Sequence, residues 1–220
     1  IFCDLDHSRL RELDRMQQRS VYTGGVVIFT QGDQPQGVYF VCSGRVKLSI
    51  YSSDGKAVIV RIATIGDVLG AKALLSGKPH NLTAETLELT QLCFIKKNDF
   101  INFLRGNGKV GLRLAQKLSN ELYEAYRGVG DISLKHSHER LKELLLRFCK
   151  NHGKPTPDGI KLEINLSQEE LAEMISVSRR TLTRVLMELK SLGIIRCGYR
   201  SIIVCDRVVL ENSVPEVSLF

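Results

Sequence analysis

The sequence predicts an α+β protein: a strand-rich first half, a long central helix, and a last part in which two helices are followed by a β-hairpin. Three observations predict this fold class. Short β-branched runs alternate with glycine turns in the first half, one continuous amphipathic stretch follows, and two helical segments in the second half lie three residues apart. We place the domain boundaries at residues 1–106, 107–132 and 133–220.

Composition and charge narrow the class of protein. The chain has 220 residues, of which 43% are hydrophobic and 25% charged, as expected for a soluble globular protein. No apolar run approaches the roughly 18 residues of a membrane span, and no secretory signal pattern is visible at the start. We therefore expect a cytoplasmic protein without a membrane partner. The net charge of +7 favours an anionic partner such as nucleic acid.

Residues 20–94 contain the predicted strands. The runs VVIF, VYFV, RVKLSIY, AVIVRIA and LCFI are separated by glycine or Asp-Gly turn residues. Regular short strands with turn signals between them indicate a compact antiparallel barrel or roll. After these strands, residues 99–104 predict a brief helix.

Residues 109–132 predict a long helix with a regular stripe of small or apolar side chains. The stripe recurs at alternating steps of four and three, at Gly111, Ala115, Leu118, Leu122, Ala125, Val129 and Ile132. A period of about 3.5 residues is typical of a seam between two helices, whereas a helix packed on its own domain would drift toward about 3.6. We predict a homodimer whose interface contains Ala115, Leu118, Leu122, Ala125 and Val129.

Two glycines, Gly128 and Gly130, lie near the end of this helix. Each weakens a helix by about 1 kcal/mol relative to alanine, which predicts a hinge over residues 127–133. The alternatives are that the glycines allow close helix packing or mark a fixed helix end.

The second half predicts a winged helix-turn-helix. An amphipathic helix, HERLKELLLRFCKNHG, is followed by a turn-rich loop KPTPDG and a short strand IKLEI. The helices SQEELAEMI and RRTLTRVLMELKSLG come next, and residues 194–205 alternate as a hairpin.

The second of these helices carries an unusual concentration of positive charge. If it buries Leu182, Val185, Leu186 and Leu189, then Arg180 and Arg184 lie on the opposite side, at about 100° per residue. Residues 176–200 hold six Lys or Arg against one Glu. The alternative to DNA binding is a merely solvated helix face.

An arginine can bond two acceptors of guanine at once, and hydroxyls at helix starts suit phosphate oxygens. The predicted DNA contacts are Ser167, Ser178, Arg179, Arg180, Thr181, Thr183, Arg184 and Arg200.

Taken together, the motifs resemble one family along the whole chain. VIFTQGD, GVYFVCSGRVKL, the GDVLG turn, the long helix and LSQEELAEMISVSRRTLTRVLMELKSLGII are similar to the cyclic-AMP receptor protein and fumarate–nitrate reduction regulator (CRP/FNR) superfamily of bacterial transcription factors. The resemblance implies a cyclic-nucleotide-binding-like β-roll and a homodimer that binds a partly palindromic duplex. It also implies allosteric control by an effector, and RNA polymerase as a partner. The family often has glutamate at the position of Arg180. We therefore do not assume that this chain recognises the family's best-known DNA half-site.

The resemblance also places the effector pocket, at Gly70, Ala71, His80, Asn81 and Tyr126. The family's cyclic-AMP pocket uses a glutamate after the turn glycine and an Arg-Ser pair further on. Here Ala71 and His80-Asn81 replace them, so the cyclic phosphate would lose a charge-assisted partner of roughly a few kcal/mol. We therefore expect an effector other than cyclic AMP.

The effector itself stays open at the level of the sequence. An iron-sulfur cluster would use Cys93, with its other ligands ahead of Ile1, and haem would use His80; a small anionic or apolar metabolite is the third possibility. The six cysteines include no CxxC pair, so no metal site is predicted and the cofactor is unknown.

Two other classes of function compete with a DNA-binding regulator. A β-roll without a DNA reader would be an effector-binding module that acts on a protein partner, and the helix-turn-helix argues against it. No phosphate loop, HExxH motif or activated nucleophile occurs, so we do not expect an enzyme.

Overall fold

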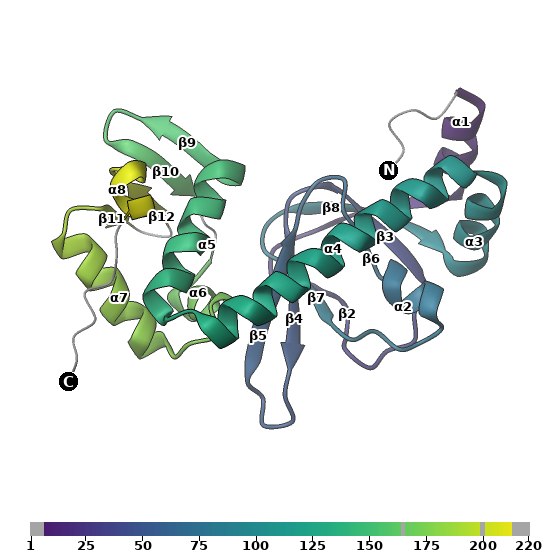
Figure 1. Cartoon of the computed structure of the whole chain (residues 1–220). Coiled ribbons are helices and arrows are strands. Elements are labelled where there is room, and N and C mark those ends of the chain that lie inside the picture. The colour runs from purple at the N-terminus through teal and green to yellow at the C-terminus, as the bar shows by residue number, and fades with distance from the viewer. Residues whose placement is uncertain (1–6, 164–165, 199–200, 213–220) are drawn as a thin grey trace. The chain divides into compact units, whose positions relative to one another are not determined.

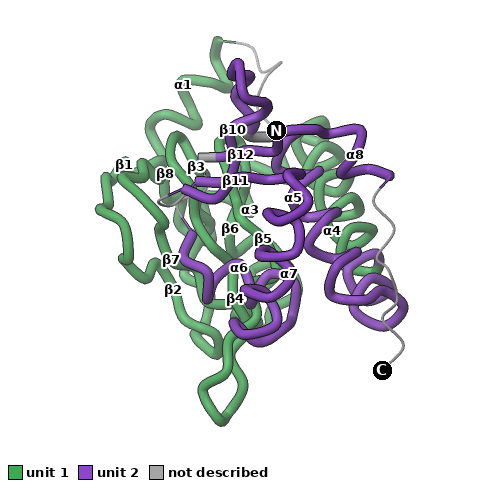
Figure 2. Tube along the Cα trace, turned by 90° about the vertical axis from the view of Figure 1, so that its left-hand side faces the viewer, with its two compact units in different colours: residues 1–126 green, residues 127–220 purple. Residues whose placement is uncertain are grey.

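The computed structural model describes residues 7–163, 166–198 and 201–212 (Figure 1). The chain forms two compact units, residues 1–126 and 127–220, which Figure 2 shows in different colours. Helix α4 (Gly108–Leu134) begins in the first unit and ends in the second.

The first unit contains two antiparallel sheets of four strands. Their orders are β1-β8-β3-β6 and β2-β7-β4-β5. The first comprises β1 (Gln17–Tyr22), β8 (Thr90–Lys96), β3 (Gly37–Ser43) and β6 (Val68–Leu69), and the second β2 (Val27–Phe29), β7 (Thr83–Thr86), β4 (Val46–Tyr51) and β5 (Ala57–Ala63). Each of the five runs predicted from the sequence forms one of these strands, although Val26 precedes β2 and Arg45 precedes β4.

Two apolar clusters hold this unit together. One cluster joins the sheets, since it contains Val41 and Leu92 from the first sheet and Leu48 and Ala84 from the second. The other covers β3 and β8 with side chains from α1 (His7–Met16), α2 (Ala71–Ser76), α3 (Lys97–Gly106) and the start of α4. The sequence predicted the helix near α3 but not α1 or α2.

The turn before α2 depends on glycine. Gly70 has a φ of 81°, a left-handed conformation that side chains other than hydrogen disfavour. A Cβ atom at Gly70 would also lie 3.1 Å from Cε1 of His80. This close approach brings Gly70, just before α2, against His80. The two residues form one wall of the hollow described below.

The second unit combines four helices with a small sheet of order β11-β12-β10-β9. Its helices, after the end of α4, are α5 (Ser137–His152), α6 (Gln168–Met174), α7 (Arg179–Ser191) and α8 (Arg207–Asn212). Its strands are β9 (Gly153–Thr156), β10 (Gly159–Glu163), β11 (Ile195–Gly198) and β12 (Ser201–Val204). The predicted helix-turn-helix followed by a hairpin corresponds to α6, α7, β11 and β12.

One local prediction was wrong. KPTPDG was expected to be entirely loop, but residues 153–156 form β9 and pair with β10 in a hairpin. Pro155 is tolerated there because β9 is an edge strand. No further strand lies on its outer side to need a hydrogen bond from the N–H group that proline lacks. The turn itself is confined to residues 157 and 158.

Candidate DNA interface and effector site

Helix α7 has one buried face and one charged face. Leu182, Val185, Leu186 and Leu189 are buried, as the sequence predicted. The side chains of Arg179, Arg180 and Arg184 are exposed. The helix therefore turns three guanidinium groups to solvent while its apolar stripe holds it on the second unit.

Serine hydroxyls fix the starts of both helices in the helix-turn-helix. Ser178 Oγ accepts a hydrogen bond from the backbone N–H of Thr181 at 3.1 Å, and the two side-chain oxygens lie 2.9 Å apart. Ser167 Oγ accepts from the N–H of Glu170 at 3.1 Å, and the Glu170 carboxylate accepts from the N–H of Ser167 at 2.8 Å. These capping bonds orient the first turns, whose remaining N–H groups favour anions.

The three arginines differ in their partners. Arg184 lies 3.5 Å from Glu188, which also contacts Nε2 of His138 at 3.0 Å. Arg179 and Arg180 have no ion-pair partner within the described ranges. Thr183 donates its hydroxyl to the carbonyl of Arg179 at 2.9 Å. Arg200, the predicted contact at the tip of the hairpin, lies outside the described residues.

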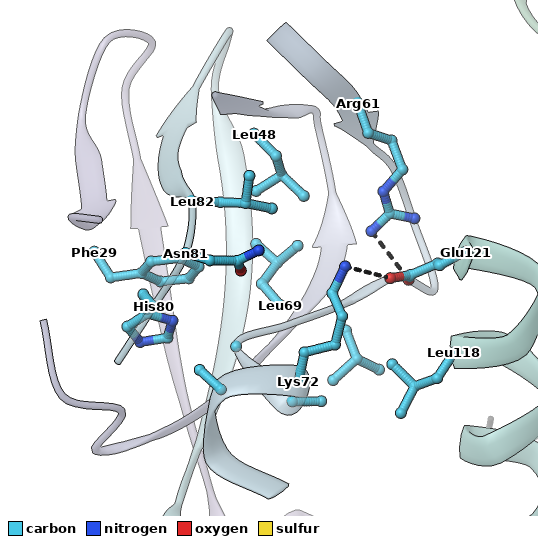
Figure 3. Close-up of a pocket in the computed structure, with 14 residues that line it drawn as sticks. Phe29, Leu48, Arg61, Leu69, Lys72, His80, Asn81, Leu82, Leu118 and Glu121 are labelled. Atoms are coloured by element: carbon cyan, nitrogen blue, oxygen red, sulfur yellow. Dashed lines mark ion pairs between the residues drawn. The ribbon is translucent and has the colours of Figure 1, made fainter. Parts of the chain in front are cut away.

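A hollow in the first unit brings together four of the five predicted effector residues. Gly70, Ala71, His80 and Asn81 line it (Figure 3). The fifth, Tyr126, does not line it and is 69% exposed. The other lining residues were not predicted: Phe29, Leu48, Arg61, Val68, Leu69, Lys72, Ala73, Leu82, Leu118 and Glu121.

His80 closes one side of the hollow as an uncharged ring. Its imidazole stacks on Phe29 with ring centroids 3.9 Å apart, and its backbone N–H donates to the carbonyl of Asp33 at 2.8 Å. Burial lowers the pKa of His80 below its ordinary value of 6.5, although Asp33 opposes the shift. At neutral pH this position therefore supplies no positive charge for a phosphate.

The opposite side of the hollow is charged. Glu121 on α4 lies 3.2 Å from Arg61 of β5 and 3.3 Å from Lys72 of α2 (Figure 3). Arg61 also lies 3.6 Å from Asp67, which pairs with Lys117 of α4 at 2.6 Å. A single network of ion pairs thus connects α4 to β5, to the turn before β6 and to α2.

One of these charges could have been found from the sequence. Arg61 interrupts the apolar run AVIVRIA two residues before Ala63, which is buried and shares its strand face. Lys72 and Glu121 carry no comparable local signal, because their meeting depends on how α2 and α4 pack.

The predicted dimer residues share one stripe of α4 but differ in their exposure. Ala115, Leu122, Ala125 and Val129 are exposed. Leu118, by contrast, packs against the core of the first unit and lines the hollow.

The described residues contain no group of three or more His, Cys, Asp or Glu side chains that could hold a metal ion. Burial raises the pKa of the Cys93 thiol to about 12, with Cys42 adding to the shift. Cys3 lies outside the described residues. Among these residues no helix is long and apolar enough to cross a membrane.

Comparison with protein families matches both parts of the chain. The cyclic nucleotide-binding domain matches residues 19–107, and the Crp-like helix-turn-helix domain matches residues 139–213.

Individual relatives match along most of the chain. The global nitrogen regulator of Synechococcus elongatus is 28% identical over 200 residues, covering 86% of each chain. The cyclic AMP receptor protein of Thermus thermophilus is 28% identical over 195 residues, covering 89% of this chain and 87% of its own. The structure of the c-di-GMP responsive global regulator CLP from Xanthomonas campestris has a TM-score of 0.83 at 19% identity, and the match covers 91% of this chain and 100% of that one.

A cyclic nucleotide-binding domain followed by a Crp-like helix-turn-helix defines a DNA-binding transcription regulator. The chain belongs to the CRP/FNR superfamily, as the sequence motifs indicated. The relatives named here are regulators, which confirms the prediction that the chain is not an enzyme.

Proposed function

We propose that the chain works as a homodimer that binds a two-fold symmetric duplex site and changes its DNA affinity when an effector other than cyclic AMP enters the hollow. The observation that carries this proposal is the exposure of Arg179, Arg180 and Arg184 on α7, the second helix of the helix-turn-helix. Such a helix enters the major groove, where guanidinium groups reach base edges and phosphates.

The exposed apolar side chains of α4 support the homodimer. Leu122, Val129 and Ile132 are all exposed on this helix and lie at steps of seven and three residues, close to one face. A helix stripe of this kind is stabilised when a second copy covers it.

The geometry of the hollow supports an effector other than cyclic AMP. Ala71 has no carboxylate for a ribose, and the neutral His80 replaces a cation for the phosphate. The two cations that do line the hollow, Arg61 and Lys72, are already paired with Glu121. RNA polymerase is proposed as a further partner on the family resemblance.

Selection from random duplexes, followed by fluorescence anisotropy at several salt concentrations, tests the proposed DNA binding. The enriched site should have two-fold symmetry, with half-sites about 34 Å apart, and the affinity should fall steeply with salt. Sedimentation should show a dimer, and cyclic AMP should leave the affinity unchanged. An asymmetric site would contradict the dimer, and a cyclic AMP response would contradict the effector assignment.

A further inference from the structure

The hollow of the first unit already contains a carboxylate. Glu121 is largely buried, with its side chain 11% exposed, and its two oxygens are divided between two cations. Oε1 faces the guanidinium of Arg61 at 3.2 Å, and Oε2 faces the ammonium of Lys72 at 3.3 Å. This corner of the hollow is therefore shaped and charged to hold a carboxylate group.

The rest of the hollow is mostly apolar. Phe29, Leu48 and Leu82 line it beside the amide of Asn81 (Figure 3). The lining residues include no formal charge besides Arg61, Lys72 and Glu121, because His80 is kept neutral by burial. Without Glu121 the lining would carry two positive charges next to an apolar wall.

We propose that the effector is a small organic carboxylate that displaces Glu121 from Arg61 and Lys72 and lays its apolar body against Phe29, Leu48 and Leu82. The inference rests on the proposed function, since it takes the hollow as the effector site. Glu121 acts as a built-in competitor that fills the cation pair until the ligand arrives. Inorganic phosphate satisfies the cations but leaves the apolar wall uncovered, so the organic carboxylate is the better fit.

Displacement of Glu121 releases part of α4 from the first unit. Two residues one turn apart anchor the helix: Lys117, through Asp67 at 2.6 Å and the carbonyl of Gly66 at 3.1 Å, and Glu121, through Arg61 and Lys72. A ligand on Arg61 and Lys72 breaks only the second anchor. The broken anchor is the one nearer to residue 127, where the second unit begins.

Calorimetric titration of the full chain tests the ligand class, with hexanoate, hexanamide and inorganic phosphate as probes. In wild type, hexanoate binds only the fraction of molecules in which Glu121 has left the cations, which weakens its apparent affinity. Glu121→Gln removes the competitor and should tighten hexanoate binding by about tenfold or more. Hexanamide should bind neither protein, and adding Arg61→Met to Glu121→Gln should abolish hexanoate binding.

Glu124→Gln is the matched control, because it makes the same change on the same helix at an exposed residue that does not line the hollow. It should bind hexanoate as wild type does. A measurement on the unaltered protein makes the test independent of folding in the variant. In wild type with ¹³C-labelled glutamate, hexanoate, but not hexanamide, should shift one buried carboxyl signal toward the solvent-exposed position.

Three results would overturn the proposal: equal hexanoate affinity in wild type and Glu121→Gln, equal affinity for hexanoate and hexanamide, or phosphate binding as tight as hexanoate binding. The proposed function is tested separately by DNA affinity. Hexanoate binding without any change in DNA affinity would refute the regulatory role while leaving the ligand class in place. Absence of duplex binding altogether would refute the proposed function.

Discussion

Arg184, on the charged face of α7, makes one weak ion pair within its own helix. Its side chain is 63% exposed and lies 3.5 Å from Glu188, one helical turn away. Exposed pairs at this spacing contribute only about 0.3–0.5 kcal/mol, so the guanidinium can leave Glu188 for a base edge at little cost.

Arg184→Ala should therefore weaken DNA binding without unfolding the protein. We expect a loss of about 1–3 kcal/mol on the selected site and relaxed preference at one base pair per half-site. Anisotropy titrations on the selected duplex and on singly substituted duplexes measure both effects. Arg15→Ala, which removes the same charge from the exposed surface of α1, should keep the sequence preference. Equal losses on selected and random duplexes would refute the role of Arg184 in base reading.

His80 should make the first unit sensitive to acid. Because burial lowers the pKa of His80 below 6.5, the unfolded chain takes up this proton more readily than the folded one. The free energy of unfolding should then fall as the pH drops through about 6.5, and the stabilisation is complete only above that value.

His80→Phe keeps a ring against Phe29 but cannot be protonated, so its stability should depend less steeply on pH between about 7 and 5. Urea midpoints at several pH values measure the slope, which matters here more than the absolute stability. His7→Phe, at an exposed position on α1, is the control for loss of an imidazole. A slope in His80→Phe as steep as that of wild type would show that another group is responsible.

At the scale of elements, α4 presents different residues to its own unit and to solvent. Val110 and Leu114 are buried and Leu118 is partly buried, four residues apart, whereas Leu122 is 52% exposed. A second copy of the chain would therefore meet Leu122 but only the edge of Leu118.

Leu122→Glu should break the dimer. A carboxylate buried in the seam without a partner costs about 3–5 kcal/mol, which is enough to shift a dimer to monomers at micromolar concentration. Sedimentation velocity measures the change. Asn120→Glu adds the same charge at an exposed position on the other side of α4 and should leave the dimer intact. An unchanged dimer in Leu122→Glu would place the interface elsewhere.

The elements that could be predicted from the sequence are those with local causes. The strand AVIVRIA and the helix start at Ser178 depend on nearby residues, and both were located correctly. The orientation of Leu118 could not be predicted, because three heptads barely distinguish periods of 3.5 and 3.6, and its burial depends on distant strands. The contact of Arg61 with Glu121 was missed for the same reason, since it joins a strand to a helix far along the chain.

At the scale of the whole molecule, α4 is the element shared by the unit with the hollow and the unit with the charged helix α7. Its residues 127–133 are helical, and the helix continues to Leu134, so Gly128 and Gly130 do not mark its end. A Cβ atom at either glycine would meet nothing within 4 Å among the described atoms, so close packing inside the chain does not explain them. Two explanations remain open: close packing of the glycines against α4 of a second copy, and the predicted hinge, which rests on their effect on helix stability.

Gly128→Ala combined with Gly130→Ala should stiffen this segment and weaken the link between effector and DNA. Each substitution favours the helix by about 1 kcal/mol, and neither introduces a clash within the chain. Amide hydrogen exchange over residues 127–133 should slow in the double variant relative to wild type. A segment held helical responds less to release of Glu121, so the ratio of DNA affinities with and without hexanoate should move toward one. Ser133→Ala is the control, because it changes an exposed residue of the same segment and keeps both glycines. It should keep the wild-type ratio of DNA affinities with and without hexanoate. A double variant with slower exchange but the full response would locate the hinge outside residues 127–133.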